Sequence, residues 1–168
     1  MLQDWRNYMK IKNYFPMFVD LSGKNIVVVG GGAIAARRIK TLLSFTRNIS
    51  VVAAQASPEV TELGKAGLID LKVRPVKRSD FSAAYMVIAA TNDRKLNDDI
   101  YRICKNEGIY VNVASDREKC DFYFPGIVME DELVVGITAS GLDHKKAKRV
   151  REEIQSVLER IQKEENDG

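Results

Sequence analysis

The amino-acid sequence predicts an α/β protein: a doubly wound parallel sheet, followed by a small β-hairpin and a long C-terminal helix. Two observations carry this prediction. Short, wholly apolar runs alternate with amphipathic runs as far as Val113, which is typical of a parallel sheet covered by helices on both faces. Beyond Val113, two strand-like runs follow each other with no helix between them, and one long amphipathic stretch comes last.

The first half of the sheet begins with residues 25–29, an apolar run that predicts a strand buried on both faces. Residues 33–45 predict a helix, and residues 49–54 predict the second strand. Ser57 and Pro58 predict the start of the next helix, because serine caps helices and proline favours their first position. The expected buried stripe of the first helix consists of Ile34, Ile39, Leu42 and Leu43.

Three further strands are expected at residues 68–73, 85–90 and 109–113. Between the last two strands lies a predicted helix, which Asn92 or Asp93 caps and Gly108 closes.

The C-terminal segment contains predicted strands at residues 122–129 and 133–139, joined by an acidic turn at residues 130–132. A long amphipathic helix follows from about Lys145. Its apolar stripe consists of Val150, Ile154, Leu158 and Ile161. This segment is too small for a core of its own, so its apolar faces must be covered, either by the rest of the same chain or by a second copy, which is the favoured reading.

Length and composition limit the class of protein. The 168 residues suffice for one domain with an appendage, and the net charge of +3 is too small to predict a nucleic-acid partner. No apolar run approaches the ~20 residues of a membrane span, and the N-terminus lacks the apolar region of a signal peptide. The two cysteines suit a reducing compartment, where they act as packing thiols. We therefore expect a cytoplasmic protein with no membrane partner.

The link between the first strand and the first helix has the pattern Gly30-x-Gly32-x-x-Ala35, the dinucleotide fingerprint of Rossmann folds. Gly30 permits the tight turn, and Gly32, beside Gly31, lets a pyrophosphate approach the backbone. Ala35 lets the helix pack closely on the strand, and the phosphates then meet the free N–H groups of the helix N-terminus. A tight turn kept for packing alone is the alternative reading.

The ends of the second and fourth strands supply the other cofactor candidates. An NAD enzyme usually carries an acid after the second strand, whereas here the first acid, Glu59, lies inside the next helix. Gln55 or Ser57 could instead bind the ribose hydroxyl, so NAD is only slightly favoured over NADP. Thr91 and Asn92 follow the fourth strand and are candidates for contact with the nicotinamide, with helix capping as the other reading of Asn92.

Four separated segments together resemble precorrin-2 dehydrogenase, the dehydrogenase module of siroheme synthase; they are residues 14–43, 89–93, 111–128 and 136–141. The resemblance extends over about residues 13–160. It implies NAD-dependent oxidation of precorrin-2 to sirohydrochlorin in a homodimer whose C-terminal segments are exchanged. Some members also act as ferrochelatases, and that second activity is left open here. The implied parts are an N-terminal extension (1–12), an NAD-binding Rossmann domain (13–113) and a dimerisation and substrate segment (114–168).

The resemblance also implies roles for single residues. The cofactor contacts that it adds are Ala33, Ile34, Ala54 and Gln55. Bifunctional members place an aspartate where this chain has Ser115; here the acid is Asp116, either a stand-in for acid–base work or a loop cap. Asp121 is a weaker candidate for the same work. The substrate candidates are Ser115, Thr138 and Ser140, and the basic cluster Lys145, Lys146, Lys148, Arg149 and Arg151, which would bind the carboxylates of the tetrapyrrole.

No metal site is expected, because His144 is the only histidine and no Cys/His cluster has ligand spacing. A plain solvated helix face is the alternative for the basic cluster. The alternative for the whole chain is a non-catalytic nucleotide-sensing module, which needs no basic helix but usually keeps the ribose-binding acid.

Overall fold

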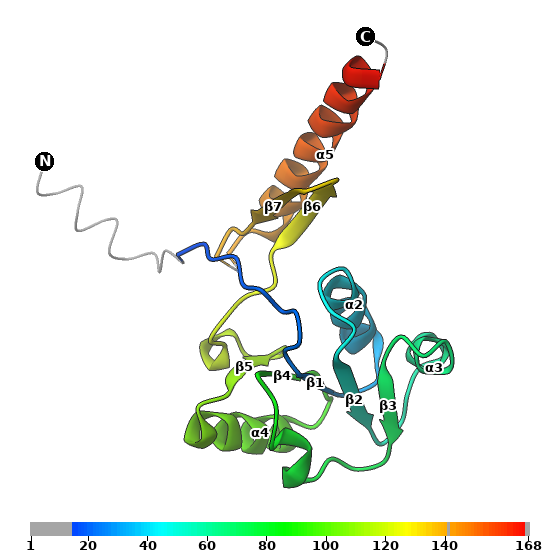
Figure 1. Cartoon of the computed structure of the whole chain (residues 1–168). Coiled ribbons are helices and arrows are strands. Elements are labelled where there is room, and N and C mark those ends of the chain that lie inside the picture. The colour runs from blue at the N-terminus through cyan, green and yellow to red at the C-terminus, as the bar shows by residue number, and fades with distance from the viewer. Residues whose placement is uncertain (1–14, 141, 167–168) are drawn as a thin grey trace, which may run out of the picture. The chain divides into compact units, whose positions relative to one another are not determined.

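The chain divides into two compact units in a computed structural model that describes residues 15–140 and 142–166 (Figure 1). One unit is Val19–Tyr123. The other contains the chain from Phe124 onward, together with the short segment that ends at Phe18. The expected extension at residues 1–12 lies outside the described residues.

The larger unit is built on a five-stranded parallel sheet with the order β3-β2-β1-β4-β5. Its strands are β1 (Ile26–Val29), β2 (Ile49–Ala53), β3 (Asp70–Val73), β4 (Met86–Ala89) and β5 (Tyr110–Val113). The chain steps outward from β1 to β3, then returns across β1 to β4 and continues to β5. This reversal makes β1 and β4 the switch point, where open α/β sheets bind their ligands. The predicted fold is confirmed.

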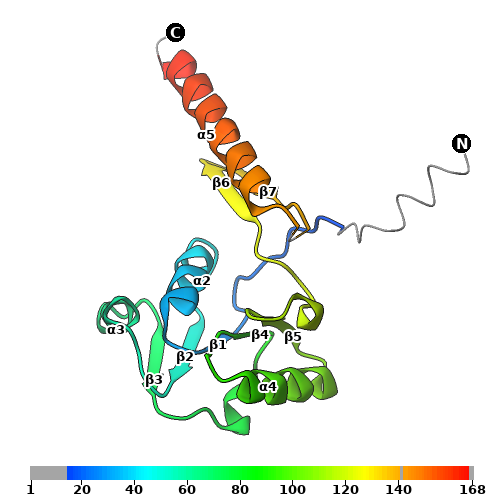
Figure 2. The ribbon, with the colours of Figure 1, turned by 180° about the vertical axis from the view of Figure 1, so that it is seen from behind.

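Three helices cover the sheet of this unit. Helices α2 (Ala33–Leu43) and α3 (Pro58–Lys65) lie on one side, and α4 (Arg94–Glu107) lies on the other (Figures 1 and 2). Right-handed crossovers dictate this division, because the connections run in opposite directions on the two sides of β1. A 3₁₀ helix, η1 (Arg78–Phe81), precedes β4, and a second one, η2 (Arg117–Lys119), follows β5.

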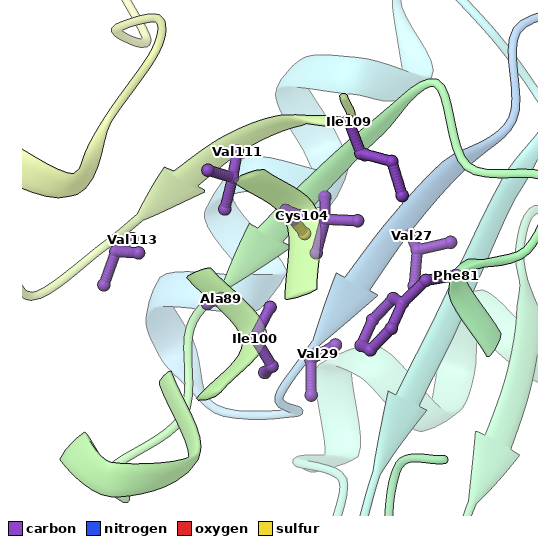
Figure 3. Packing of buried hydrophobic residues seen from close by; sticks show 10 residues of the cluster. Val27, Val29, Phe81, Ala89, Ile100, Cys104, Ile109, Val111 and Val113 are labelled. Atoms are coloured by element: carbon purple, nitrogen blue, oxygen red, sulfur yellow. The ribbon is translucent and has the colours of Figure 1, made fainter. Parts of the chain in front are cut away.

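The core on the α4 side is formed by alternate residues of the central strands (Figure 3). Val27 and Val29 of β1 belong to the same cluster as Ile100 and Cys104 of α4, and Phe81 of η1 is packed with them. Alternation along a strand sends the intervening side chains to the other face, toward α2. Central strands buried on both faces explain why their sequences are apolar throughout.

The predicted helix boundaries follow local chemistry. The Ser57 hydroxyl accepts a hydrogen bond from the Val60 N–H at 3.4 Å and caps α3, as predicted. Of the two predicted caps of α4, Asp93 is the one that serves, since its carboxylate accepts from the Leu96 N–H at 3.0 Å. Gly108 ends α4 with a φ of 69°, a conformation that glycine adopts without strain.

Two predicted core residues of α2 do not belong to its buried stripe: Leu43 is only half-buried, and Ile34 is exposed. Ile34 is 46% exposed, because the first turn of α2 stands at the open carboxyl edge of the sheet. The buried stripe of this helix is instead Ala35, Ala36, Ile39 and Leu42.

The smaller unit contains an antiparallel hairpin, β6 (Gly126–Glu130) and β7 (Leu133–Ile137), and the helix α5 (His144–Asn166). Strand β6 begins four residues later than the prediction of residue 122, since the backbone of Phe122 is bound to the larger unit's β5. Val128 is buried, whereas Val157 and Ile161 of α5 are 41% and 43% exposed. Even α5, with 23 residues, lacks the apolar composition of a membrane-spanning helix, and the other described helices lack it too.

Candidate functional site

Gly30 and Gly31 are required by close packing at the end of β1. Gly30 has a φ of +122°, and a Cβ atom there would lie 2.4 Å from the carbonyl oxygen of Ala90. A Cβ atom on Gly31 would lie 2.4 Å from the carbonyl oxygen of Gln55, and the Gly31 carbonyl accepts from the Ser57 N–H at 2.8 Å. These two glycines therefore let the ends of β4 and β2 close in on the turn from both sides.

Gly32 has a different role, because a Cβ atom there would meet nothing within 4 Å. It is the N-cap residue of α2, and no side chain caps this helix. The first turn contains no acid, and Gly32, Ala33 and Ile34 are all exposed. The N–H groups and the positive end of the helix dipole thus face an open surface, which is the environment that a pyrophosphate requires. The residues present fit a dinucleotide.

The end of β2 offers one free polar side chain for the ribose. Ala54 and Gln55 are exposed, as the predicted cofactor contact requires. Ser57 is engaged in capping α3, and Glu59 forms an ion pair with Lys40. Gln55 is therefore the better placed of the two predicted ribose ligands.

Thr91 at the end of β4 is held by a residue that the sequence reading missed. The Thr91 hydroxyl donates to the side-chain oxygen of Asn97 at 2.7 Å, and the Asn97 amide donates to the Thr91 carbonyl at 3.0 Å. Asn97 is 1% exposed and lies on α4 in line with Ile100 and Cys104. A polar residue inside the apolar stripe of a helix was the available signal. Asn92, the next residue, is exposed, and its predicted contact with the nicotinamide stays a prediction.

Asp116 lies just beyond the end of β5. Its N–H donates to the Val113 carbonyl at 3.1 Å, and one carboxylate oxygen accepts from the Glu118 N–H at 3.1 Å, so it caps η2. The other oxygen lies 3.3 Å from the ammonium of Lys119. Ser115 is exposed next to it. The capping reading is confirmed, and the catalytic role stays a prediction.

The loop after β5 is fixed to β5 and α4 at several points. Asp121 receives the Lys105 ammonium on one oxygen at 2.7 Å and the Val111 N–H on the other at 3.0 Å. The side-chain amide of Asn112 donates to the Phe122 carbonyl at 2.8 Å. Asp121 thus has a structural part to play, which weakens its candidacy as an acid or base.

Both cysteines lie in this part of the fold. Cys104 is buried in the core, and burial raises the pKa of its thiol to about 12. Burial also raises the pKa of Cys120, which is half-buried. Both therefore stay thiols at neutral pH, in keeping with a packing role.

The predicted substrate residues of the smaller unit surround the start of α5. Thr138 accepts a hydrogen bond from the Ser140 N–H at 3.1 Å, and Ser140 has a positive φ of 54°, which is uncommon outside glycine. Gly141, between Ser140 and α5, lies outside the described residues. Asp143 caps the helix by accepting from the Lys146 N–H at 2.8 Å.

The basic cluster lies on the first turns of α5, where Lys145, Lys146 and Arg149 are exposed. Cations at a helix N-terminus oppose the helix dipole, by about 0.3–1 kcal/mol each. This arrangement disfavours the helix and favours an anion beside it. His144 is exposed at the helix start, and no group of three or more His, Cys, Asp or Glu side chains that could hold a metal occurs in the described part of the chain.

A parallel sheet whose first strand ends in a glycine turn, at an uncapped helix N-terminus beside the switch point, defines a dinucleotide-binding domain of the Rossmann class. The family described as "Putative NAD(P)-binding" matches residues 17–126. The structure of SirC, precorrin-2 dehydrogenase, has a TM-score of 0.76 and 30% sequence identity, covering 85% of this chain and 70% of that one. The chain belongs to this NAD(P)-binding family, and its structural relative is a precorrin-2 dehydrogenase.

Curated relatives agree with this placement. The probable multifunctional siroheme biosynthesis protein HemA of Ruminiclostridium josui is 42% identical over 144 residues, which are 85% of this chain and 28% of that protein. The siroheme synthase of Actinobacillus succinogenes is 32% identical over 146 residues, 87% of this chain and 31% of that protein. The chain thus spans less than a third of the length of these relatives.

Proposed function

We propose that this protein oxidises precorrin-2 to sirohydrochlorin with NAD as the acceptor. The glycine turn with its open helix N-terminus is the observation that carries the proposal, because it fits the diphosphate of a dinucleotide. The relationship to SirC and to the siroheme synthases supports the choice of substrate. In this proposal residues 13–113 bind the nucleotide and residues 114–168 serve dimerisation and substrate binding.

The oxidation removes a hydride and a proton from the substrate. A bound nicotinamide supplies the acceptor for the hydride, so that the protein has mainly to position the reactants. The N–H groups at Gly32, Ala33 and Ile34 hold the pyrophosphate, and Gln55 binds the ribose. We assign Asp116 as the base that accepts the proton from the substrate. Its carboxylate lies at the carboxyl edge of the sheet, and two contacts fix its orientation.

The basic residues at the start of α5 bind the substrate in this proposal. Precorrin-2 is a tetrapyrrole that carries many carboxylates, and Lys145, Lys146 and Arg149 present exposed cations at a helix N-terminus. Thr138 and Ser140 precede them and offer hydroxyl groups for neutral hydrogen bonds. The unfavourable dipole at this helix end is relieved when carboxylates lie beside it.

The oligomeric state is part of the proposal. We expect a homodimer with exchanged C-terminal segments, supported by the exposed apolar residues Leu133, Val157 and Ile161 of the hairpin and α5. Sedimentation equilibrium should give twice the chain mass, and a monomer at micromolar concentration would contradict this part. The two free thiols support a cytoplasmic location, which cell fractionation can check.

The direct experiment follows NADH formation when precorrin-2 and NAD are supplied to the folded protein. We expect NADH and sirohydrochlorin in equal amounts, and NADP is measured in parallel because the end of β2 bears no free acid among the described residues. Asp116→Ala should lower kcat by about 10²-fold or more while NAD still binds. NAD binding with no tetrapyrrole affinity and no turnover would instead support the nucleotide-sensing module.

A further inference from the structure

We propose that Lys119 is a positioning residue, which holds the carboxylate of Asp116 in one orientation and is itself held by Asp98 of α4. The inference rests on the proposed function, in which Asp116 takes the proton. It assigns parts to two residues that neither the sequence motifs nor the glycine turn indicates.

The contacts form a chain of three charges. The ammonium of Lys119 lies 2.6 Å from a carboxylate oxygen of Asp98 and 3.3 Å from one of Asp116. The second oxygen of Asp116 accepts the N–H of Glu118 at 3.1 Å. Both oxygens of Asp116 are therefore engaged, and rotation of its carboxylate would break one contact or the other.

The positive charge of Lys119 separates the negative charges of Asp98 and Asp116. The hydrogen bond to Asp98 raises the pKa of Lys119, so its ammonium stays charged at neutral pH. The same hydrogen bond lowers the pKa of Asp98. Without Lys119, the two carboxylates would face each other with no cation between them, and mutual repulsion would drive Asp116 away from its present orientation.

The loop itself does not depend on Lys119. It is fixed separately by Asp121, which binds Lys105 and the backbone of Val111, and by the hydrogen bond from Asn112 to Phe122. Removal of Lys119 should therefore leave the loop in place and release only the Asp116 carboxylate. The contacts of Asp121 with Val111 and of Asn112 with Phe122 involve neither lysine, so the loop keeps them when either lysine is replaced. Lys105, the other lysine that ties this loop to α4 by an ion pair, is therefore a matched control.

The kinetic test compares Lys119→Met, Asp98→Asn, Lys119→Arg and the control Lys105→Met. We expect Lys119→Met to lower kcat by about tenfold, with KM for precorrin-2 and for NAD unchanged within about twofold. Asp98→Asn should show a smaller loss, and Lys119→Arg should restore most of kcat. In an Asp116→Ala background, Lys119→Met should have no further effect, because the two residues act as one unit.

Hydrogen exchange at the Glu118 amide provides a readout that needs no turnover. We expect exchange to be about tenfold faster in Lys119→Met and unchanged in Lys105→Met, since Asp116 accepts this N–H only in its held orientation. An unchanged kcat, an equal loss in Lys105→Met, or unchanged exchange would overturn the inference. A wild-type protein without NADH production would instead overturn the proposed function, while the exchange result would still decide whether Lys119 holds Asp116.

Discussion

At the scale of single residues, the three consecutive glycines differ in what they do. Gly30 and Gly31 are packed against the backbone of neighbouring strands, whereas Gly32 borders open space. A sequence motif treats them alike, but substitution should separate a folding role from a binding role.

Gly31→Ala should destabilise the fold by about 1–3 kcal/mol, because the added methyl group meets backbone atoms that have little freedom to move. Gly32→Ala should change the free energy of unfolding by less than about 1 kcal/mol, because the space is open and only the cap residue changes. We expect Gly32→Ala to weaken NAD binding at least about tenfold, since the methyl group stands where the pyrophosphate approaches. Urea unfolding measures the stability of both variants, and NAD titration measures their affinity. Equal losses of stability in Gly31→Ala and Gly32→Ala would contradict the separate roles of the two glycines.

At the scale of elements, the crossover from β3 to β4 is held by one carboxylate, that of Asp80, whose side chain is 7% exposed. Asp80 of η1 receives both terminal nitrogens of Arg74, at 2.8 and 2.6 Å, and the Lys77 N–H at 2.7 Å. The hydrogen bond from Arg74 lowers the pKa of Asp80 to about 2. The contribution of the Arg74–Asp80 pair to the stability of this crossover therefore depends on pH.

The pH dependence has a definite sign. Because the pKa of Asp80 is lower in the folded protein than the ordinary 3.8, its contribution of about 2 kcal/mol is complete above pH 4 and is lost as the pH falls toward 2. Asp80→Asn should be less stable than the wild type at pH 7, and the difference should shrink between pH 4 and pH 2. Urea unfolding at several pH values tests this, and a difference independent of pH would rule it out.

The junction of β4 and α4 depends on Asn97. Asn97→Leu should destabilise the fold by about 1–3 kcal/mol, because it removes the side-chain partner of the Thr91 N–H and carbonyl. It should also raise the Kd for NAD, since the loop that precedes α4 is loosened. Thr91→Ser, which keeps the hydroxyl, is the control and should behave nearly as wild type. Stability and NAD affinity are measured on the same samples, and wild-type values for Asn97→Leu would refute the assignment.

At the scale of the whole molecule, the charges at the start of α5 should govern substrate capture. Replacing Lys145 and Lys146 by Gln should raise KM for precorrin-2 by about five- to tenfold at low ionic strength, with KM for NAD unchanged. Lys163→Gln, at the other end of the same helix, is the control and should have little effect. The increase in KM for precorrin-2 should become smaller as salt is added, because salt screens the charges. An increase that does not depend on salt would indicate lost packing instead.

The sequence predicted most of the sheet and the cofactor turn, because both depend on local composition. Apolar runs identify strands buried on both faces, and glycines at a strand end identify a close approach. Ile34 was misplaced because periodicity marks a face of a helix but not where that face leaves the sheet. Asn97 could have been found, because it is a polar residue inside the apolar stripe of α4. Lys119 could not, because its partner Asp98 is 21 residues away and is brought to it by packing between elements rather than by spacing along the chain.

Helix α4 touches the nucleotide edge through Asn97 and the loop after β5 through Asp98 and Lys105. The helix therefore fixes the spacing between Thr91, at the proposed cofactor site, and Lys119, which holds Asp116. One residue inserted between Asn97 and Asp98 would turn the rest of the helix by about 100° and advance it by about 1.5 Å, so that the contacts with Thr91 and with Lys119 could not both be kept. We expect lineages of this protein to vary the solvent side of α4 freely and to preserve its length.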